Sequence, residues 1–149
     1  MFLFPIWIVL AGAALVFIAE SLKAGRTLLS VITVLTALSA TVTLVPFLFF
    51  SQPRVMNYFG GLLSFRIGPV ACIAAIFLSA FAAGCSAWLT VYYQQPKIGM
   101  VFTLLLAATG ISMASVFAAN LPSTAFFTGL TFLALLFLQK ICHSRHSGA

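Results

Sequence analysis

The sequence predicts an all-α fold, a polytopic transmembrane bundle of about five helices. Hydrophobic residues make up 63% of the 149 residues and charged residues only 5%, whereas soluble domains carry about 25% charged residues. The apolar residues form several runs of roughly 20 residues, the length that a helix needs to cross about 30 Å of hydrocarbon. We therefore expect residues 1–142 to form a single transmembrane domain and residues 143–149 to form a short polar tail.

Polar punctuation separates the expected spans. The first, residues 2–19, is closed by a polar stretch that begins at Glu20, and the second, residues 28–50, is stopped by Ser-Gln-Pro-Arg at 51–54. The third, residues 67–93, ends in two tyrosines, which favour the membrane interface. The turn Asn-Leu-Pro-Ser at 120–123 separates the fourth from the fifth. These last two spans are residues 98–119 and 124–141.

Charge predicts the orientation. We expect the first span to stay uncleaved, because no Lys or Arg precedes it as in a signal peptide; cleavage would leave four spans. With five spans, one side carries Lys23, Arg26, Lys97, Lys140 and Arg145, and the other carries Arg54 and Arg66. Positive residues favour the cytoplasmic side. This predicts an N-terminus outside and a C-terminus in the cytoplasm, in an inner membrane of the bacterial type.

The longest connection, residues 51–66, is expected on the outer side. It contains the apolar residues Met56, Tyr58, Phe59, Leu62 and Phe65. Such residues are poorly suited to bulk water. We expect this segment to lie along the membrane surface or against a partner.

Composition also excludes function classes. The net charge is +6, but the cations are scattered, whereas nucleic-acid binding needs a basic face. The single carboxylate, Glu20, rules out paired-carboxylate hydrolysis and multi-carboxylate metal cages. Cys72, Cys85 and Cys142 are too far apart for a CxxC pair, and both histidines lie outside the spans. We predict no catalytic residue, no cofactor and no nucleic-acid partner.

Glu20 is the first candidate for chemistry, because a carboxylate in a membrane helix suggests a proton relay or a ligand site. In small multidrug transporters a lone Glu in the first helix exchanges protons for drug, and residues 12–23 resemble that pattern. Lys23 lies three positions on, within reach for an ion pair, and Arg26 follows. This predicts a Glu20–Lys23 ion pair at the cytoplasmic headgroup level. The alternative is a small homo-oligomeric proton-coupled transporter that uses Glu20.

The tail offers a second cluster, Cys142, His143 and His146. Cys and His are zinc ligands, but a closed zinc site has four. We therefore expect a polar tail without a metal.

Hydroxyl and small side chains within the spans predict helix packing. The second span carries Ser30 and Thr33 among several hydroxyls, and small residues recur four apart at Ala80 and Gly84 and at Gly110 and Ala114. Small residues let membrane helices approach closely, and hydroxyls bond between helices. We expect these faces to contact other membrane subunits.

Several stretches resemble one family of membrane subunits. They are Phe-Gly-Gly-Leu-Leu-Ser-Phe at 59–65, the third span, the Leu-rich run with Ala-Thr-Gly at 100–115, and the turn Ala-Asn-Leu at 119–121. Their order is similar to the N-terminal part of the antiporter-like subunits of respiratory complex I, particularly the quinone-proximal N subunit. Related subunits occur in Mrp-type cation antiporters and membrane-bound hydrogenases. The resemblance covers most of the chain.

The chain departs from this family at the proton machinery. The family continues with Phe-x-Gly-x-Glu, and the position of that Glu is Thr131 here. A hydroxyl does not release a proton near neutral pH. The sequence also stops where the family continues into helices with channel lysines. The resemblance thus implies the packing portion of such a subunit without its pumping portion.

Together these observations predict a non-catalytic integral membrane subunit that packs, stabilises or assembles a larger complex. The expected partners are other integral membrane subunits and lipids. Two alternatives stay open: the Glu20 transporter, and an accessory subunit of a photosynthetic or oxidase complex whose pigment or haem is bound by other chains.

Overall fold

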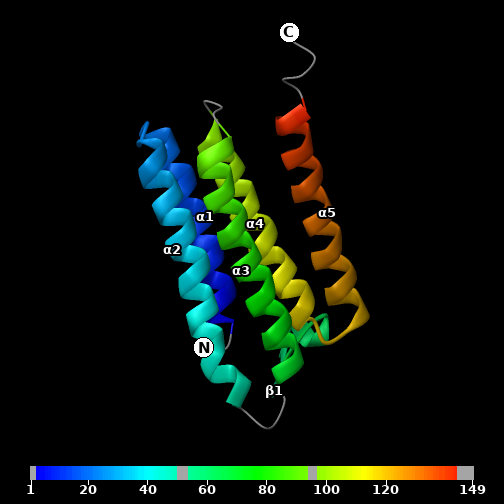
Figure 1. Ribbon diagram of the computed structural model, residues 1–149. Coiled ribbons are helices and arrows are strands. Elements are labelled where there is room, and N and C mark those ends of the chain that lie inside the picture. Colours follow the sequence, from blue (N-terminus) through cyan, green and yellow to red (C-terminus); the bar gives the residue numbers. More distant parts are fainter. Residues whose placement is uncertain (1–2, 50–53, 94–96, 144–149) are drawn as a thin grey trace.

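The computed structural model describes residues 3–49, 54–93 and 97–143, and helices dominate it (Figure 1). Five of them are long and apolar enough to cross a membrane. They are α1 (Phe4–Ser21), α2 (Arg26–Leu44), α3 (Pro69–Tyr92), α4 (Ile98–Phe117) and α5 (Leu121–His143). A 3-10 turn, η1 (Val45–Phe49), extends α2. The predicted five-span helical fold is confirmed, and the chain is a multi-pass membrane protein.

The helices run alternately up and down, with α4 at the centre (Figure 1). α4 contacts each of the other four helices, and its Phe102, Leu106 and Met113 are fully buried. α5 lies at the periphery and packs mainly on α4. Only 6% of the apolar stretch of α5 is buried, against 50% for α4. The outer surface of α5 therefore faces lipid or another molecule.

A β-hairpin follows α2, where the sequence analysis expected an interfacial segment. Strand β1 (Arg54–Tyr58) pairs antiparallel with β2 (Leu63–Ile67), joined by η2 (Phe59–Gly61). The connection takes positive φ at Phe59 (51°), Gly60 (66°) and Gly61 (94°), a conformation that glycine adopts without a Cβ penalty. Two glycines between runs of β-branched and aromatic residues are a hairpin signal, which the search for apolar helices overlooked.

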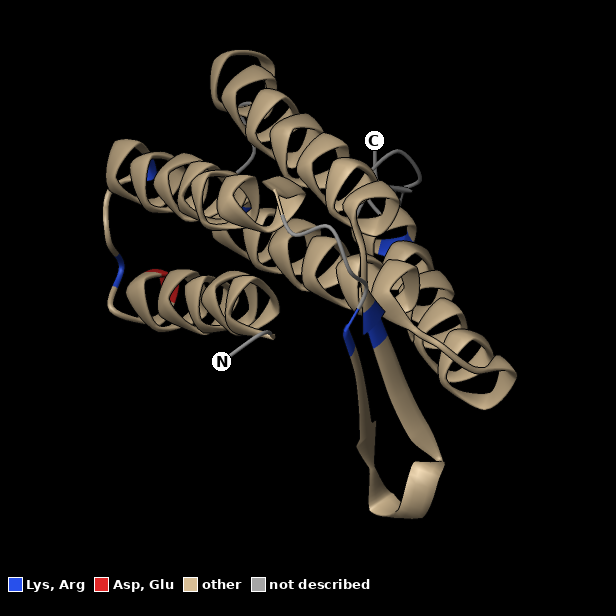
Figure 2. Ribbon diagram, turned by 90° about the horizontal axis from the view of Figure 1, so that it is seen from below, with Lys and Arg blue, Asp and Glu red and all other residues tan. Residues whose placement is uncertain are grey.

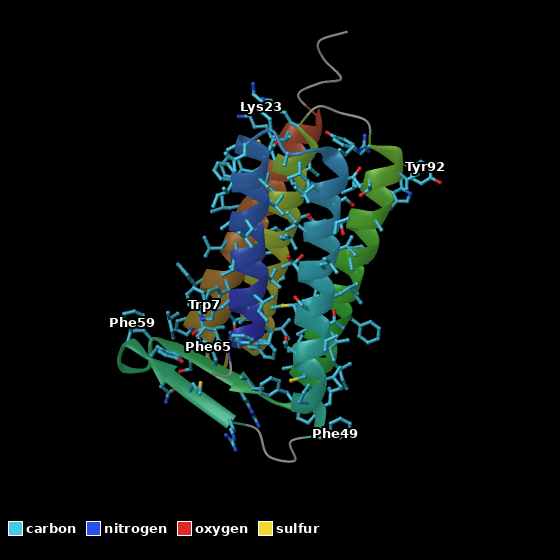
Figure 3. All side chains as sticks on the ribbon, turned by 90° about the vertical axis from the view of Figure 1, so that its left-hand side faces the viewer. Trp7, Lys23, Phe49, Phe59, Phe65 and Tyr92 are labelled. Carbon is cyan, nitrogen blue, oxygen red and sulfur yellow. The ribbon has the colours of Figure 1, made fainter. Side chains whose placement is uncertain are left out.

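The hairpin lies against the chain's own helices at the end of the bundle where the N-terminus lies (Figures 1 and 3). β2 contacts α3, α4 and α5. Phe65 of β2 is buried, and its ring lies 5.6 Å from that of Phe127 on α5. Phe65 therefore has its partners within the chain, whereas Phe59 and Leu62 at the tip of the hairpin stay exposed.

Polar groups fasten the hairpin to the turn between α4 and α5. The main-chain N–H of Ser64 donates to Ser123 Oγ (3.0 Å), and the Ser64 carbonyl accepts from the Ala119 N–H (2.7 Å). Asn120 Nδ2 donates to the Gly61 carbonyl (2.8 Å), and Asn120 Oδ1 accepts from the Ser123 N–H (3.1 Å). Asn120 thus caps the N-terminus of α5 and holds the hairpin with the same amide group.

Replacing Asn120 with alanine should release the hairpin, because it removes both the cap and the bonds to Gly61. We expect a local loss of about 1–2 kcal/mol, seen as roughly tenfold faster hydrogen exchange at the Ser64 amide. Asn120→Asp keeps the cap acceptor but loses the donor, so it should loosen the hairpin and leave the first turn of α5 protected. Unchanged exchange at Ser64 in both variants would contradict this role.

Candidate docking face and helix-packing sites

Glu20 lies in the last turn of α1, but it forms no ion pair with Lys23 among the described residues. The helix ends before Lys23, which removes the i,i+3 spacing on which this prediction depends. Lys23 adopts φ 58°; its N–H donates to the Glu20 carbonyl (2.9 Å), while the Ala24 N–H donates to the Ala19 carbonyl (2.9 Å). This is a Schellman ending. Lys23 therefore leaves the helical path on which an i,i+3 pair depends.

Glu20 instead packs on the first turn of α4. A Cβ placed on Gly99 would lie 2.7 Å from Glu20 Cδ and 2.8 Å from Glu20 Cβ. The absence of a side chain at Gly99 thus makes room for the glutamate. A helix N-terminus carries a partial positive charge, which favours a nearby carboxylate.

The described charged side chains lie at the two ends of the bundle. Glu20, the red position in Figure 2, shares its end with Lys23, which Figure 3 places opposite the hairpin. Arg26 opens α2 and Lys97 precedes α4 at this same end, while Lys140 lies in the last turn of α5. Arg54 and Arg66 lie on the two strands of the hairpin. The middle of each described span therefore consists of apolar and hydroxyl side chains.

A polar seam joins α2 to α3. Ser30 Oγ and Thr90 Oγ1 lie 2.5 Å apart, and Thr41 Oγ1 lies 2.7 Å from Ser79 Oγ. At the end of the seam, the Arg26 guanidinium donates to the carbonyls of Leu89 and Thr90. These carbonyls belong to the last turn of α3, where a helix supplies few donors; the Leu89 carbonyl also accepts from the Tyr93 N–H (2.9 Å). The sequence analysis did not identify this capping role of Arg26.

Two predicted docking residues, Ser30 and Thr33, belong to this internal packing. Ser30 is 7% exposed, and Thr33 is fully buried and donates to the Leu29 carbonyl (2.7 Å). A buried side chain cannot contact another subunit. The expectation that this face of the second span docks a partner is therefore corrected: it packs within the chain.

Glycines mark the close approaches between helices. A Cβ on Gly12 would lie 2.1 Å from Thr36 Cγ2 of α2, and one on Gly110 would lie 3.0 Å from Leu10 Cδ2 of α1. Ala114, one turn after Gly110, is 4% exposed. The predicted small-residue pair Gly110 and Ala114 is thus a packing face, but α1 of the same chain occupies it.

The other predicted pair, Ala80 and Gly84, lies on an outward face of α3. Both residues are exposed, and a Cβ on Gly84 would meet no atom within 4 Å. Large exposed side chains flank the pair: Phe77 and Phe81 are each 71% exposed and Trp88 is 60% exposed. We call Phe77, Ala80, Phe81, Gly84 and Trp88 the outer face of α3. On this surface the small residues Ala80 and Gly84 lie between large aromatic side chains.

A groove separates α3 from α5 over the C-terminal turns of α4. It consists of adjoining compartments that share Val116. One lies beside Arg66, Pro69 and Ala74, and another beside Leu78, Ser112 and Thr131. We call this the α3–α5 groove. The groove could not be predicted from the sequence, because no residue pattern indicates which pairs of helices are not in contact.

Comparisons with protein families, with curated proteins and with solved structures find no match to this chain. The fold and its contacts define the class: a five-span helical membrane protein with a β-hairpin at one end of the bundle. Among residues 3–49, 54–93 and 97–143, no group of three or more potential metal ligands comes together. The side chains of Cys142, His143 and His146 lie outside the described part.

Proposed function

We propose that this chain is a non-catalytic subunit that packs within, and stabilises, a larger membrane complex. The observation that carries the proposal is the outer face of α3. Side chains of another helix of the chain pack against Gly12, Gly99 and Gly110, whereas no described side chain packs against Gly84. Small residues at this spacing let a second helix approach closely. A helix from another subunit is the partner that this surface fits.

The chemistry of the spans supports a packing role. Ser115 Oγ of α4 lies 2.9 Å from Thr128 Oγ1 of α5, so this hydroxyl pair joins two helices, and Thr131 Oγ1 donates within α5 to the Phe127 carbonyl (2.9 Å). These hydroxyls do not titrate near neutral pH. Thr131 is the position at which the antiporter-like subunits carry a glutamate. We propose a parent complex of the complex I, cation-antiporter or energy-converting hydrogenase kind.

The proposed location is the inner membrane of a bacterial-type cell, with the hairpin outside. The end opposite the hairpin holds Lys23, Arg26, Lys97 and Lys140, and the hairpin holds Arg54 and Arg66. Cytoplasmic loops carry the excess of Lys and Arg. This charge difference supports a cytoplasmic position for the end that carries Lys23.

Gly84→Leu should separate the chain from its complex without unfolding it, because leucine fills the outer face of α3 at a position where a Cβ would meet no described atom within 4 Å. Membranes carrying tagged protein are solubilised gently, and co-migrating proteins are identified after native electrophoresis. We expect the natural chain in a large assembly and Gly84→Leu mainly as a free, folded chain. A matched control is Ala14→Leu, at an exposed position of α1, which should stay assembled.

Two outcomes would contradict the proposal. If the natural chain is a stable monomer that co-migrates with nothing, it is no subunit of a complex. If Ala14→Leu releases the chain as readily as Gly84→Leu does, the outer face of α3 is not the docking surface.

A further inference from the structure

We infer that the α3–α5 groove binds an anionic phospholipid, with an acyl chain along the groove and the phosphate at Arg66. This inference does not rest on the proposed subunit role, because it concerns the single chain in lipid, although Phe77 and Phe81 line both the groove and the outer face of α3. Four features carry it: the length of the groove, its lining, the position of Arg66 and the absence of a counter-charge.

The groove has the dimensions of one lipid leaflet. It follows α3 from Pro69 at the hairpin end to Phe81, which is about 18 Å of helix. Half of a hydrocarbon core about 30 Å thick is about 15 Å. The compartment beside Arg66 has a volume of 440 Å³, within the usual range for small-molecule sites. A single acyl chain that enters at the hairpin end can therefore lie in the groove over its full depth.

The lining matches an acyl chain. Ala74, Leu78 and Val116 form the walls and floor, with Phe132 and Leu135 of α5 on the far side. Ser112 also lines the groove, and its hydroxyl makes no hydrogen bond to any described residue.

Arg66 supplies the headgroup contact. It lies on β2, lines the mouth of the groove and is exposed. Figure 2 shows the cationic positions of the two strands where the hairpin joins the helices. A guanidinium binds phosphate through two parallel hydrogen bonds. An anionic headgroup at this position would lie in the leaflet at the hairpin end, directly above the groove.

The chain has no acidic side chain that could pair with Arg66 in place of a lipid phosphate. Its single acidic residue, Glu20, lies in the last turn of α1, at the end of the bundle opposite the hairpin, where Figure 3 labels Lys23. Within the described part of the chain, the Arg66 side chain has no ion pair or hydrogen bond. Its guanidinium is therefore available to a lipid phosphate, which the membrane offers at this depth.

The test measures lipid selectivity with the whole chain in vesicles of phosphatidylcholine. Spin-labelled phosphatidylglycerol or spin-labelled phosphatidylcholine is added, and the motionally restricted fraction gives their relative association constant. We expect the natural chain to prefer phosphatidylglycerol by about fivefold, and Arg66→Gln to bring the ratio close to one. Lys23→Gln removes one charge at the opposite end and should keep most of the preference.

A second variant tests the groove itself. Leu78→Trp fills the middle of the groove, so it should reduce the restricted fraction of phosphatidylglycerol while Arg66 is intact. Circular dichroism of each variant verifies that the helices are kept. Equal association of the two lipids with the natural chain would overturn the inference. So would an equal loss of preference in Arg66→Gln and Lys23→Gln, or a restricted fraction that Leu78→Trp leaves unchanged.

Discussion

Gly12→Val should destabilise the protein by about 3 kcal/mol, the upper end of the usual cost of overpacking. A Cβ at Gly12 alone would lie 2.1 Å from Thr36 Cγ2 and 2.8 Å from Thr36 Cβ, and valine adds two further methyl groups. Thr36 cannot easily turn aside, because its Oγ1 donates to the Ile32 carbonyl (2.7 Å) and a β-branched side chain has few rotamers in a helix. α1 and α2 would have to separate. Unfolding in mixed detergent micelles measures the loss.

Gly129→Val is the matched control, since Gly129 also lies within a helix but a Cβ there would meet no atom within 4 Å. It should cost much less than Gly12→Val. Thr36→Ala removes the two closest atoms, so the double variant Gly12→Val/Thr36→Ala should be more stable than the sum of the single losses predicts. Equal losses for the two glycine variants would show that α1 and α2 do not meet at Gly12.

Hydropathy was sufficient to predict the five helices because a membrane helix depends on length and apolar composition. The expected fourth span, residues 98–119, corresponds to α4 (Ile98–Phe117), and the expected third, residues 67–93, to α3 (Pro69–Tyr92). Their ends agree closely because prolines and polar residues punctuate the runs. The hairpin escaped this reasoning because its strands are too short to form an apolar run.

The packing sites were harder to predict, because small residues do not reveal which helix they meet. Gly110 and Gly84 have similar sequence surroundings, yet α1 covers Gly110 and nothing in the chain covers Gly84. Likewise, the spacing of Glu20 and Lys23 suits a helix, but α1 ends at Ser21. Sequence spacing assumes a continuous element, and only the three-dimensional fold shows where the element ends and what lies beside it.

Arg26→Gln is expected to cost about 1.5–3 kcal/mol, the usual range for hydrogen bonds to charged groups. The Arg26 guanidinium donates to the Leu89 carbonyl (3.2 Å) and to the Thr90 carbonyl. Glutamine is too short to reach both from α2, so these two carbonyls would lose the donors that Arg26 supplies. The helix dipole also favours a cation at this position. The seam between Ser30 and Thr90 should loosen with it.

Lys23→Gln separates this effect from the loss of charge. Lys23 lies at the same end of the bundle, is exposed and makes no side-chain hydrogen bond among the described residues. Both variants remove one positive charge, so an equal change in stability would mean that Arg26 acts only through its charge. A larger loss in Arg26→Gln, together with faster hydrogen exchange in the last turn of α3, would assign the effect to the carbonyl contacts. Arg26→Lys should then recover only part of the loss, because an ammonium group lacks the planar fork that reaches two carbonyls.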